Sequence, residues 1–349
     1  MRMKRIYSVL MMVGLVWLTC CNKDEDHVKL LAPHVVQTDC SPPTDGEIVA
    51  IDVHDKDTVF VAALEDTVTT NPSLRRLKMF FTTNGGQSWT SIPSPVELVQ
   101  NVNGMAFFNQ YNGAVILDKI ARITKNEGYT WGSYSLELML CMGRTSNNDI
   151  YFIQDWGGSI NFDIFQLLPD NYTPQVVYNY NAGDSYFFKR GVQTGNYLYL
   201  FENAPCYSYH LEGIDLTTFQ EVSVVGMIGN CYNDVTSLTN KGGRILLTRK
   251  DGWEYTANFH DDPESTDYMC KLNAGAKMFA SDYLGNGVYI AGGEGILACN
   301  HKGMWQHIYT VGSKNFPYTF KFLKNVGNNS FYAACDDGSL FRYELALPQ

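Results

Sequence analysis

An eight-residue motif occurs twice in the chain and constrains its fold more than any other feature. Residues 82–89 read TTNGGQSW and residues 124–131 read TKNEGYTW, so the two central Asn residues are 42 positions apart. The Asn side chain can hydrogen-bond the backbone that follows it, and the Gly can adopt positive φ, which together favour a tight hairpin. A spacing of about 42 residues is that of a four-stranded repeat unit. The residues predicted to stabilise the two hairpins are Thr82, Asn84, Gly86, Trp89, Thr124, Asn126, Gly128 and Trp131.

Seven short apolar runs recur through the rest of the chain and predict one buried strand in each repeat. The first run starts at residue 59 and the last at residue 331, so the six intervals average about 45 residues. Clusters of Asn, Asp and Gly separate the runs, and no long helical periodicity is present. The runs are 59–64, 114–117, 150–153, 197–201, 245–247, 288–291 and 331–334.

The repeated motif resembles the Asp-box, or BNR, repeat of sialidase-type and sortilin-type β-propellers, with Asn in place of the usual Asp. The resemblance implies an all-β propeller of four-stranded antiparallel blades, in which the box is a structural feature on the face away from the ligand. Seven blades agree best with the seven runs, and six or eight remain open. Residues 28–37 (VKLLAPHVVQ) are predicted to supply the strand that the last blade lacks, which would close the ring.

The first 32 residues have the layout of a targeting segment. Basic residues precede an apolar run over 6–18 that is too short to span a bilayer, as in a secretory leader. Residues 18–21 (LTCC) resemble a bacterial lipobox, with Cys21 as the acylated residue and Cys20 as the alternative. Residues 22–26 (NKDED) resemble the export tag of Bacteroidetes surface lipoproteins. We therefore expect a signal peptide over 1–21, an acidic tether over 22–32 and one propeller domain over 33–349.

The predicted location is the bacterial outer membrane, with a lipid anchor and exposure at the cell surface; the periplasmic face is the alternative. The full chain carries a formal charge of −10, and loss of the leader would remove three basic residues and make the charge about −13. This charge argues against nucleic acid or anionic lipid as the ligand. A monomeric module is expected.

An acidic residue follows nearly every predicted second strand. In a propeller these acids would lie on the face opposite the box hairpins, where an electronegative collar could bind a cation, an amine or sugar hydroxyls. Ordinary turn chemistry is the alternative, because Asp and Glu next to Gly are common in tight loops. The acids are Glu65, Asp118, Asp155, Glu202, Asp251, Glu294 and Asp336.

Aromatic residues share that predicted face and could stack on sugar rings, although packing between blades is the alternative for most of them. Trp156 and Tyr180 are the strongest candidates, because the residues around them are small and polar. The ligand-binding residues predicted from acids and aromatics together are Asp155, Trp156, Tyr180, Glu202, Tyr207, Tyr232, Asp251, Trp253, Glu294 and Asp336.

No metal, cofactor or catalytic residue is predicted. The histidines lack ligand spacing and the cysteines form no CxxC pattern. Sialidases use an arginine triad and an Arg-Ile-Pro motif, and the latter does not occur here. The leading hypothesis is a non-catalytic surface propeller that binds a glycan or protein partner. The alternatives are a glycoside hydrolase of sialidase-like fold that uses two loop carboxylates, and an assembly factor for a membrane complex, which photosystem II stability-factor-like propellers suggest.

Overall fold

The computed structural model describes residues 34–346, with internal gaps. The gaps are 68–70, 72, 136–137, 156–160, 170–172, 182–187, 203–210, 225–234, 242–243, 250–253, 259–265, 270–276, 286, 302–303, 309–317 and 328. In several strands, including all of β19 to β22, only the backbone is described. The leader, the lipobox with Cys21 and the tether lie outside the described residues. In the described part, no helix is long and apolar enough to cross a bilayer.

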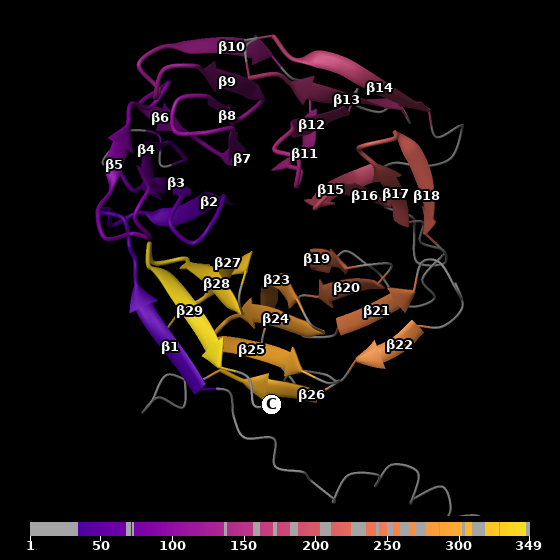
Figure 1. The fold of residues 1–349 in the computed structure, drawn as a ribbon. Coiled ribbons are helices and arrows are strands. Elements are labelled where there is room, and N and C mark those ends of the chain that lie inside the picture. The colour runs from indigo at the N-terminus through magenta and orange to yellow at the C-terminus, as the bar shows by residue number, and fades with distance from the viewer. Residues whose placement is uncertain are drawn as a thin grey trace, which may run out of the picture. The chain divides into compact units, whose positions relative to one another are not determined.

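The described residues form seven antiparallel sheets, each made of four strands in sequence order, except that β1 supplies the fourth strand of the sheet formed by β27, β28 and β29 (Figure 1). The first strands are β2 (Glu47–Val53), β7 (Val102–Phe107), β11 (Leu138–Arg144), β15 (Phe188–Thr194), β19 (Val235–Lys241), β23 (Met278–Gly285) and β27 (Phe320–Gly327). The second strands are β3 (Val59–Glu65), β8 (Gly113–Leu117), β12 (Ile150–Asp155), β16 (Tyr197–Glu202), β20 (Arg244–Arg249), β24 (Val288–Gly293) and β28 (Ser330–Cys335).

The third and fourth strands complete the sheets. The third strands are β4 (Arg75–Thr82), β9 (Ile120–Thr124), β13 (Asn161–Leu167), β17 (Leu211–Asp215), β21 (Glu254–Asn258), β25 (Ile296–His301) and β29 (Leu340–Ala346). The fourth strands are β5 (Thr90–Ile92), β10 (Trp131–Ser135), β14 (Gln175–Asn181), β18 (Gln220–Val224), β22 (Thr266–Met269), β26 (Met304–His307) and β1 (His34–Asp39). A two-residue strand, β6 (Leu98–Val99), also pairs with β4.

All seven predicted apolar runs are second strands. They read as continuous apolar segments because each sheet is covered on both faces, and β24 is buried along its whole length. The core lies between neighbouring sheets. Phe60 of β3 and Phe107 of β7, for example, stack with ring centroids 4.4 Å apart inside a cluster shared by the first two sheets.

The first strands of consecutive sheets contact one another from β2 to β27, and β27 contacts β2. The strand that joins the last sheet spans His34–Asp39 and overlaps the predicted segment 28–37 over residues 34–37; residues 28–33 lie outside the described residues. It pairs with β29 over six residues, from His34 opposite Ala346 to Asp39 opposite Phe341.

Each repeated motif forms a hairpin between the third and fourth strands, with the same internal hydrogen bonds in both copies. The Thr82 and Thr124 hydroxyls accept the N–H of Gly86 and Gly128 at 3.1 and 2.9 Å. The Asn84 carbonyl oxygen accepts the N–H of Ser88 at 3.0 Å, and the Asn126 oxygen accepts the N–H of Thr130 at 2.9 Å. The Thr and Asn side chains of each motif therefore accept backbone N–H groups of the turn in place of backbone carbonyls.

The Trp residues of the motif contact the sheet before their own, whereas the sequence predicted that they stabilise their own hairpin. Trp89 Nε1 donates to the carbonyl of Cys40, just after β1, at 3.1 Å. Trp131 Nε1 donates to the carbonyl of Pro93, just after β5, at 3.0 Å. Both rings are half-buried. Cys40 and Pro93 thus occupy equivalent places, at the end of the fourth strand of the preceding sheet.

A buried carboxylate joins the first strands of three sheets. Asp52 of β2 is 8% exposed, and its Oδ2 accepts the N–H of Phe107 in β7 at 2.8 Å. Its Oδ1 lies 3.2 Å from Nη2 of Arg144 in β11, and His54 Nε2 lies 3.2 Å from its Oδ2. Burial alone would raise the pKa of Asp52, but the His54 hydrogen bond, the Arg144 charge and the Phe107 N–H together lower it.

Candidate functional site

Strand register distinguishes the two ends of the strands in each sheet. In the first sheet, Thr82 at the start of the motif hairpin lies opposite Val59, and Arg76 lies opposite Glu65 at the other end of β3. The motif hairpins therefore lie at one end of the strands, here called the box face. The acids that follow the second strands in the described residues lie at the other end, here called the acid face, as the sequence predicted.

Two acids of the predicted collar bind the backbone of their own sheet. Asp118 Oδ1 accepts the N–H of Asn101 at 3.0 Å, and Asp336 Oδ1 accepts the N–H of Thr319 at 3.2 Å. In both cases the acceptor follows the donor by 17 residues, and the acid's own N–H donates back to the carbonyl of the same residue. These carboxylates close the ends of the sheets, which supports the turn-chemistry alternative for them.

Two further acids also have partners. Glu294 forms an exposed ion pair with Lys277, with Nζ 3.0 Å from Oε1. Glu65 accepts a hydrogen bond from the Thr44 hydroxyl at 2.9 Å. Each acid of the collar whose side chain is described is thus engaged by a residue close to it, and no three potential metal ligands are grouped together among the described residues.

The aromatic prediction for Tyr180 needs correction. Tyr180 lies in the fourth strand β14 rather than on a loop, is 5% exposed and stacks on Phe162 with centroids 4.6 Å apart. It belongs to the core between the third and fourth sheets. The ring of Tyr180 is buried because its large apolar surface packs between two neighbouring sheets.

The remaining predicted ligand residues lie outside what the structure describes. Asp155 and Glu202 end the second strands β12 and β16, as expected, but their side chains are not described. No position is described for Trp156, Tyr207, Tyr232, Asp251 and Trp253. Their assignment to a ligand site stays a prediction.

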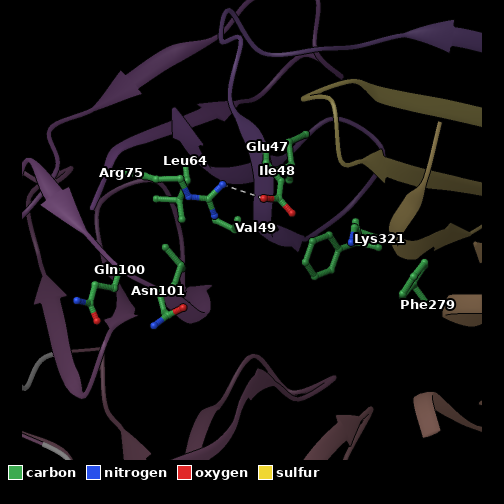
Figure 2. A pocket seen from close by; sticks show the side chains of 11 residues that line it. Glu47, Ile48, Val49, Leu64, Arg75, Gln100, Asn101, Phe279 and Lys321 are labelled. Carbon is green, nitrogen blue, oxygen red and sulfur yellow. Dashed lines mark hydrogen bonds and ion pairs between the residues drawn. The ribbon is translucent and has the colours of Figure 1, made fainter. Parts of the chain in front are cut away.

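A pocket of about 340 Å³ opens on the acid face at the start of the first strands (Figure 2). Four first strands contribute to it, namely β2, β7, β23 and β27. Its lining combines aliphatic, aromatic, amide and charged side chains: Glu47, Ile48, Val49, Leu64, Arg75, Gln100, Asn101, Val102, Phe279, Lys321 and Phe322. A concave site of this kind, with an apolar base and a few polar groups, is the usual form of a ligand site.

The charges of the pocket are arranged in two groups, as Figure 2 shows. Arg75 Nη1 lies 2.9 Å from Glu47 Oε2, and the two side chains are 28% and 34% exposed. Lys321 Nζ lies 4.6 Å from the centre of the Phe279 ring, a cation–π contact. With one carboxylate and two cations, the lining carries one formal positive charge in an acidic chain.

The sequence did not identify this pocket. No local pattern indicates that Arg75 and Lys321, which are 246 residues apart, line one cavity. Chemically, the pocket offers guanidinium, ammonium and amide donors beside aliphatic side chains. No group of three or more potential metal ligands occurs among the described residues.

No protein-family model matches the sequence, and no curated protein matches it significantly. Solved structures do resemble it in fold. A catalytically inactive virginiamycin B lyase from Staphylococcus aureus, with quinupristin, aligns with a TM-score of 0.63 and 11% identity over 89% of this chain and 100% of that chain. BamB from Moraxella catarrhalis aligns with a TM-score of 0.53 and 14% identity over 90% of this chain and 99% of that chain.

A third structure, YCF48 bound to a D1 peptide, covers 89% of this chain and 96% of its own at 14% identity, with a TM-score of 0.43. At such identities the likeness concerns the fold alone. Together with the antiparallel sheets described above, the likeness to the lyase shows that the described part of the chain is a β-propeller of four-stranded antiparallel blades.

Proposed function

We propose that this chain is a non-catalytic propeller that binds a segment of a protein partner on its acid face. The pocket lined by Arg75, Lys321 and the starts of four first strands carries this proposal. It combines an apolar base with hydrogen-bond donors, and its walls belong to first strands that are each paired with the second strand of their sheet.

A protein partner fits the pocket better than a glycan does. Sugar rings stack on open aromatic faces. In this pocket the ring of Phe279 carries the Lys321 ammonium over one face, and Phe322 packs against the core shared by the first and last sheets. The pocket's aliphatic residues and amides instead match a peptide side chain and its backbone groups.

Binding without catalysis is favoured by the same lining. Hydrolysis of a glycosidic bond by two carboxylates needs both of them beside one bond. Glu47 is the single carboxylate in the lining, and Arg75 pairs with it. The glycoside hydrolase alternative would therefore need acids outside this pocket.

We further propose that the seven sheets are the blades of one closed ring. The contact between β27 and β2 and the pairing of β1 with β29 support this arrangement. This pairing between the two ends of the chain covers the edge of β29, which would otherwise be the last strand of its sheet.

The lipid anchor at Cys21 and the outer-membrane location are proposals that depend on the lipobox-like residues 18–21 and on the tether 22–32. Incorporation of a labelled fatty acid, lost in Cys21→Ala, would test the anchor. An anchored chain would present the propeller at the membrane surface, where it could bind a partner as an assembly factor does.

The binding proposal is tested with the chain from residue 33 onward, presented to a random peptide library and a glycan array. Asn101→Trp fills the pocket from an exposed position, and Val176→Trp places a Trp on the exposed outer strand β14 as a control. We expect peptide binding that Asn101→Trp abolishes and Val176→Trp leaves intact. Binding of glycans alone would favour the glycan alternative, and no binding to either array would refute the proposal.

A further inference from the structure

The pocket on the acid face has a charge opposite to that of the chain around it. The whole chain carries a formal charge of −10, whereas the pocket lining contains Arg75 and Lys321 against Glu47 alone. A small positive region in an acidic surface attracts an anionic group and directs it to one place.

Arg75 has donors to spare for such a group. Its ion pair with Glu47 engages Nη1, and a guanidinium carries five N–H donors, so four have no partner among the described residues. The planar fork of a guanidinium matches a carboxylate in two parallel hydrogen bonds. The side chain is 28% exposed, so a ligand in the pocket can reach it.

Lys321 provides the second cation, from a different sheet. Among the described residues, no carboxylate lies within ion-pair distance of its ammonium, which instead lies over Phe279. A ligand carboxylate near this ammonium would be attracted to it. The attraction is stronger in the pocket than in open solvent, because the pocket excludes part of the water that would screen the two charges.

The uncharged residues of the lining indicate which chemical group would carry the anion. Val49 and Val102 line the same pocket and are half-buried, and Gln100 and Asn101 are exposed residues of the lining. An aliphatic group with a carboxylate at its end matches this combination, and a polypeptide offers it as a Glu side chain or as the free C-terminus of an apolar residue.

We infer that the acid-face pocket binds an aliphatic carboxylate of a polypeptide through Arg75 and Lys321. This inference rests on the proposed function and names the chemistry of its ligand. The two sources, a glutamate side chain and a chain terminus, share the group that the pocket recognises.

The test uses the chain from residue 33 onward and nuclear magnetic resonance titration with small probes. N-acetyl-leucine provides the terminal carboxylate, N-acetyl-glutamate α-amide provides the side-chain carboxylate, and N-acetyl-leucinamide is the neutral control of the same shape. We expect at least one acidic probe to shift the backbone amide signals of Gln100, Asn101 and Val102 at millimolar concentration. The neutral control should bind about tenfold more weakly or not at all.

Four variants connect the effect to the two cations. Arg75→Gln and Lys321→Gln should each weaken the acidic probe about tenfold, and Lys321→Arg should retain binding. Arg76→Gln is the matched control, because Arg76 neighbours Arg75 on β4, pairs with Glu97 at 3.6 Å and does not line the pocket. Unchanged thermal midpoints confirm that the variants fold.

The outcomes separate this inference from the proposed function. Equal binding of N-acetyl-leucine and its amide, unchanged affinity in Arg75→Gln and Lys321→Gln, or no shift with any probe would overturn the carboxylate site. Peptide binding that Asn101→Trp blocks but that shows no preference for acids would leave the proposed function intact. Stronger binding of glucuronate than of both acidic peptide probes would assign the pocket to a sugar acid and overturn the inference.

Discussion

Replacing Asp52 by Asn tests whether the ties between inner strands stabilise the fold. The substitution keeps the shape of the side chain and an oxygen that can accept the Phe107 N–H, but it removes the charge that faces Arg144. The Arg144 side chain is 17% exposed and the Asp52 side chain is 10% exposed, so the guanidinium would lose its counter-ion in a mostly buried place.

The expected cost follows from these contacts. Breaking a fully buried ion pair costs about 3–5 kcal/mol, because one charge is left without a partner. Some solvent reaches this pair, and Asn retains one hydrogen bond to β7, so we expect Asp52→Asn to lower the free energy of unfolding by about 2–4 kcal/mol.

The cost should also depend on pH. Because the pKa of Asp52 is lower in the folded chain than its ordinary value of 3.8, the ionised carboxylate contributes stability above that value. This contribution is lost as the pH falls through the folded pKa. The difference between wild type and Asp52→Asn should therefore be full at neutral pH and should shrink below about pH 3.8.

Urea unfolding monitored by circular dichroism measures the effect at pH 7 and at pH 3. Asp57→Asn is the control, since Asp57 forms a surface pair with Lys56 whose side chains are 46% and 69% exposed; its cost should stay below about 0.5 kcal/mol. An Asp52→Asn variant as stable as wild type at pH 7, or a difference that grows in acid, would refute the reasoning.

Three further predictions concern the hairpins and the strand at the N-terminus. Gly86→Ala and Gly128→Ala should each cost about 2–5 kcal/mol in urea unfolding, because both residues have positive φ and a Cβ would lie 2.5 Å from Cys40 Cβ or 2.6 Å from Ile92 Cγ2; Gly195→Ala, with φ +57° and open space around it, should cost about 1–2 kcal/mol, and equal costs at the three sites would contradict the packing. Trp89→Ala and Trp131→Ala should each cost about 2–3 kcal/mol, less than the roughly 3–5 kcal/mol of a fully buried aromatic side chain, because both rings are half-buried; an unchanged unfolding midpoint would show that the rings do not join sheets. A chain that begins at Cys40 should exchange the backbone amides of β29 for deuterium faster than a chain that begins at His34, since β1 covers that strand; equal exchange rates would mean that the pairing does not hold in solution.

The sequence predicted the elements of the fold that local patterns encode. Runs such as 59–64 and 331–334 are second strands because both faces of a blade are buried, and burial on both faces produces an uninterrupted apolar segment. The two motifs form hairpins because Thr and Asn satisfy the turn from within eight residues. These interactions are short in sequence and can be recognised there.

Interactions between sheets could not be predicted in the same way. Trp89 bonds to Cys40 and Arg144 to Asp52, at separations of 49 and 92 residues, and neither pair leaves a local pattern. The acids after the second strands were recognised, but the sequence left their role open between turn chemistry and a ligand site, because a carboxylate that closes its own sheet and one that faces a ligand occupy the same place in the sequence. Tyr180 shows the converse, since small polar neighbours suggested a loop although sheet packing buries the ring.

The most direct test of the proposed carboxylate site is a double-mutant cycle between Lys321 and the ligand charge. The affinities of wild type and Lys321→Gln are measured for N-acetyl-leucine and for N-acetyl-leucinamide. If the ammonium meets the ligand carboxylate, the two changes should be coupled by about 1 kcal/mol or more, because removing either charge removes the same interaction. A coupling energy of zero, with the affinities for the acid and for the amide changed equally by Lys321→Gln, would contradict the proposed carboxylate site.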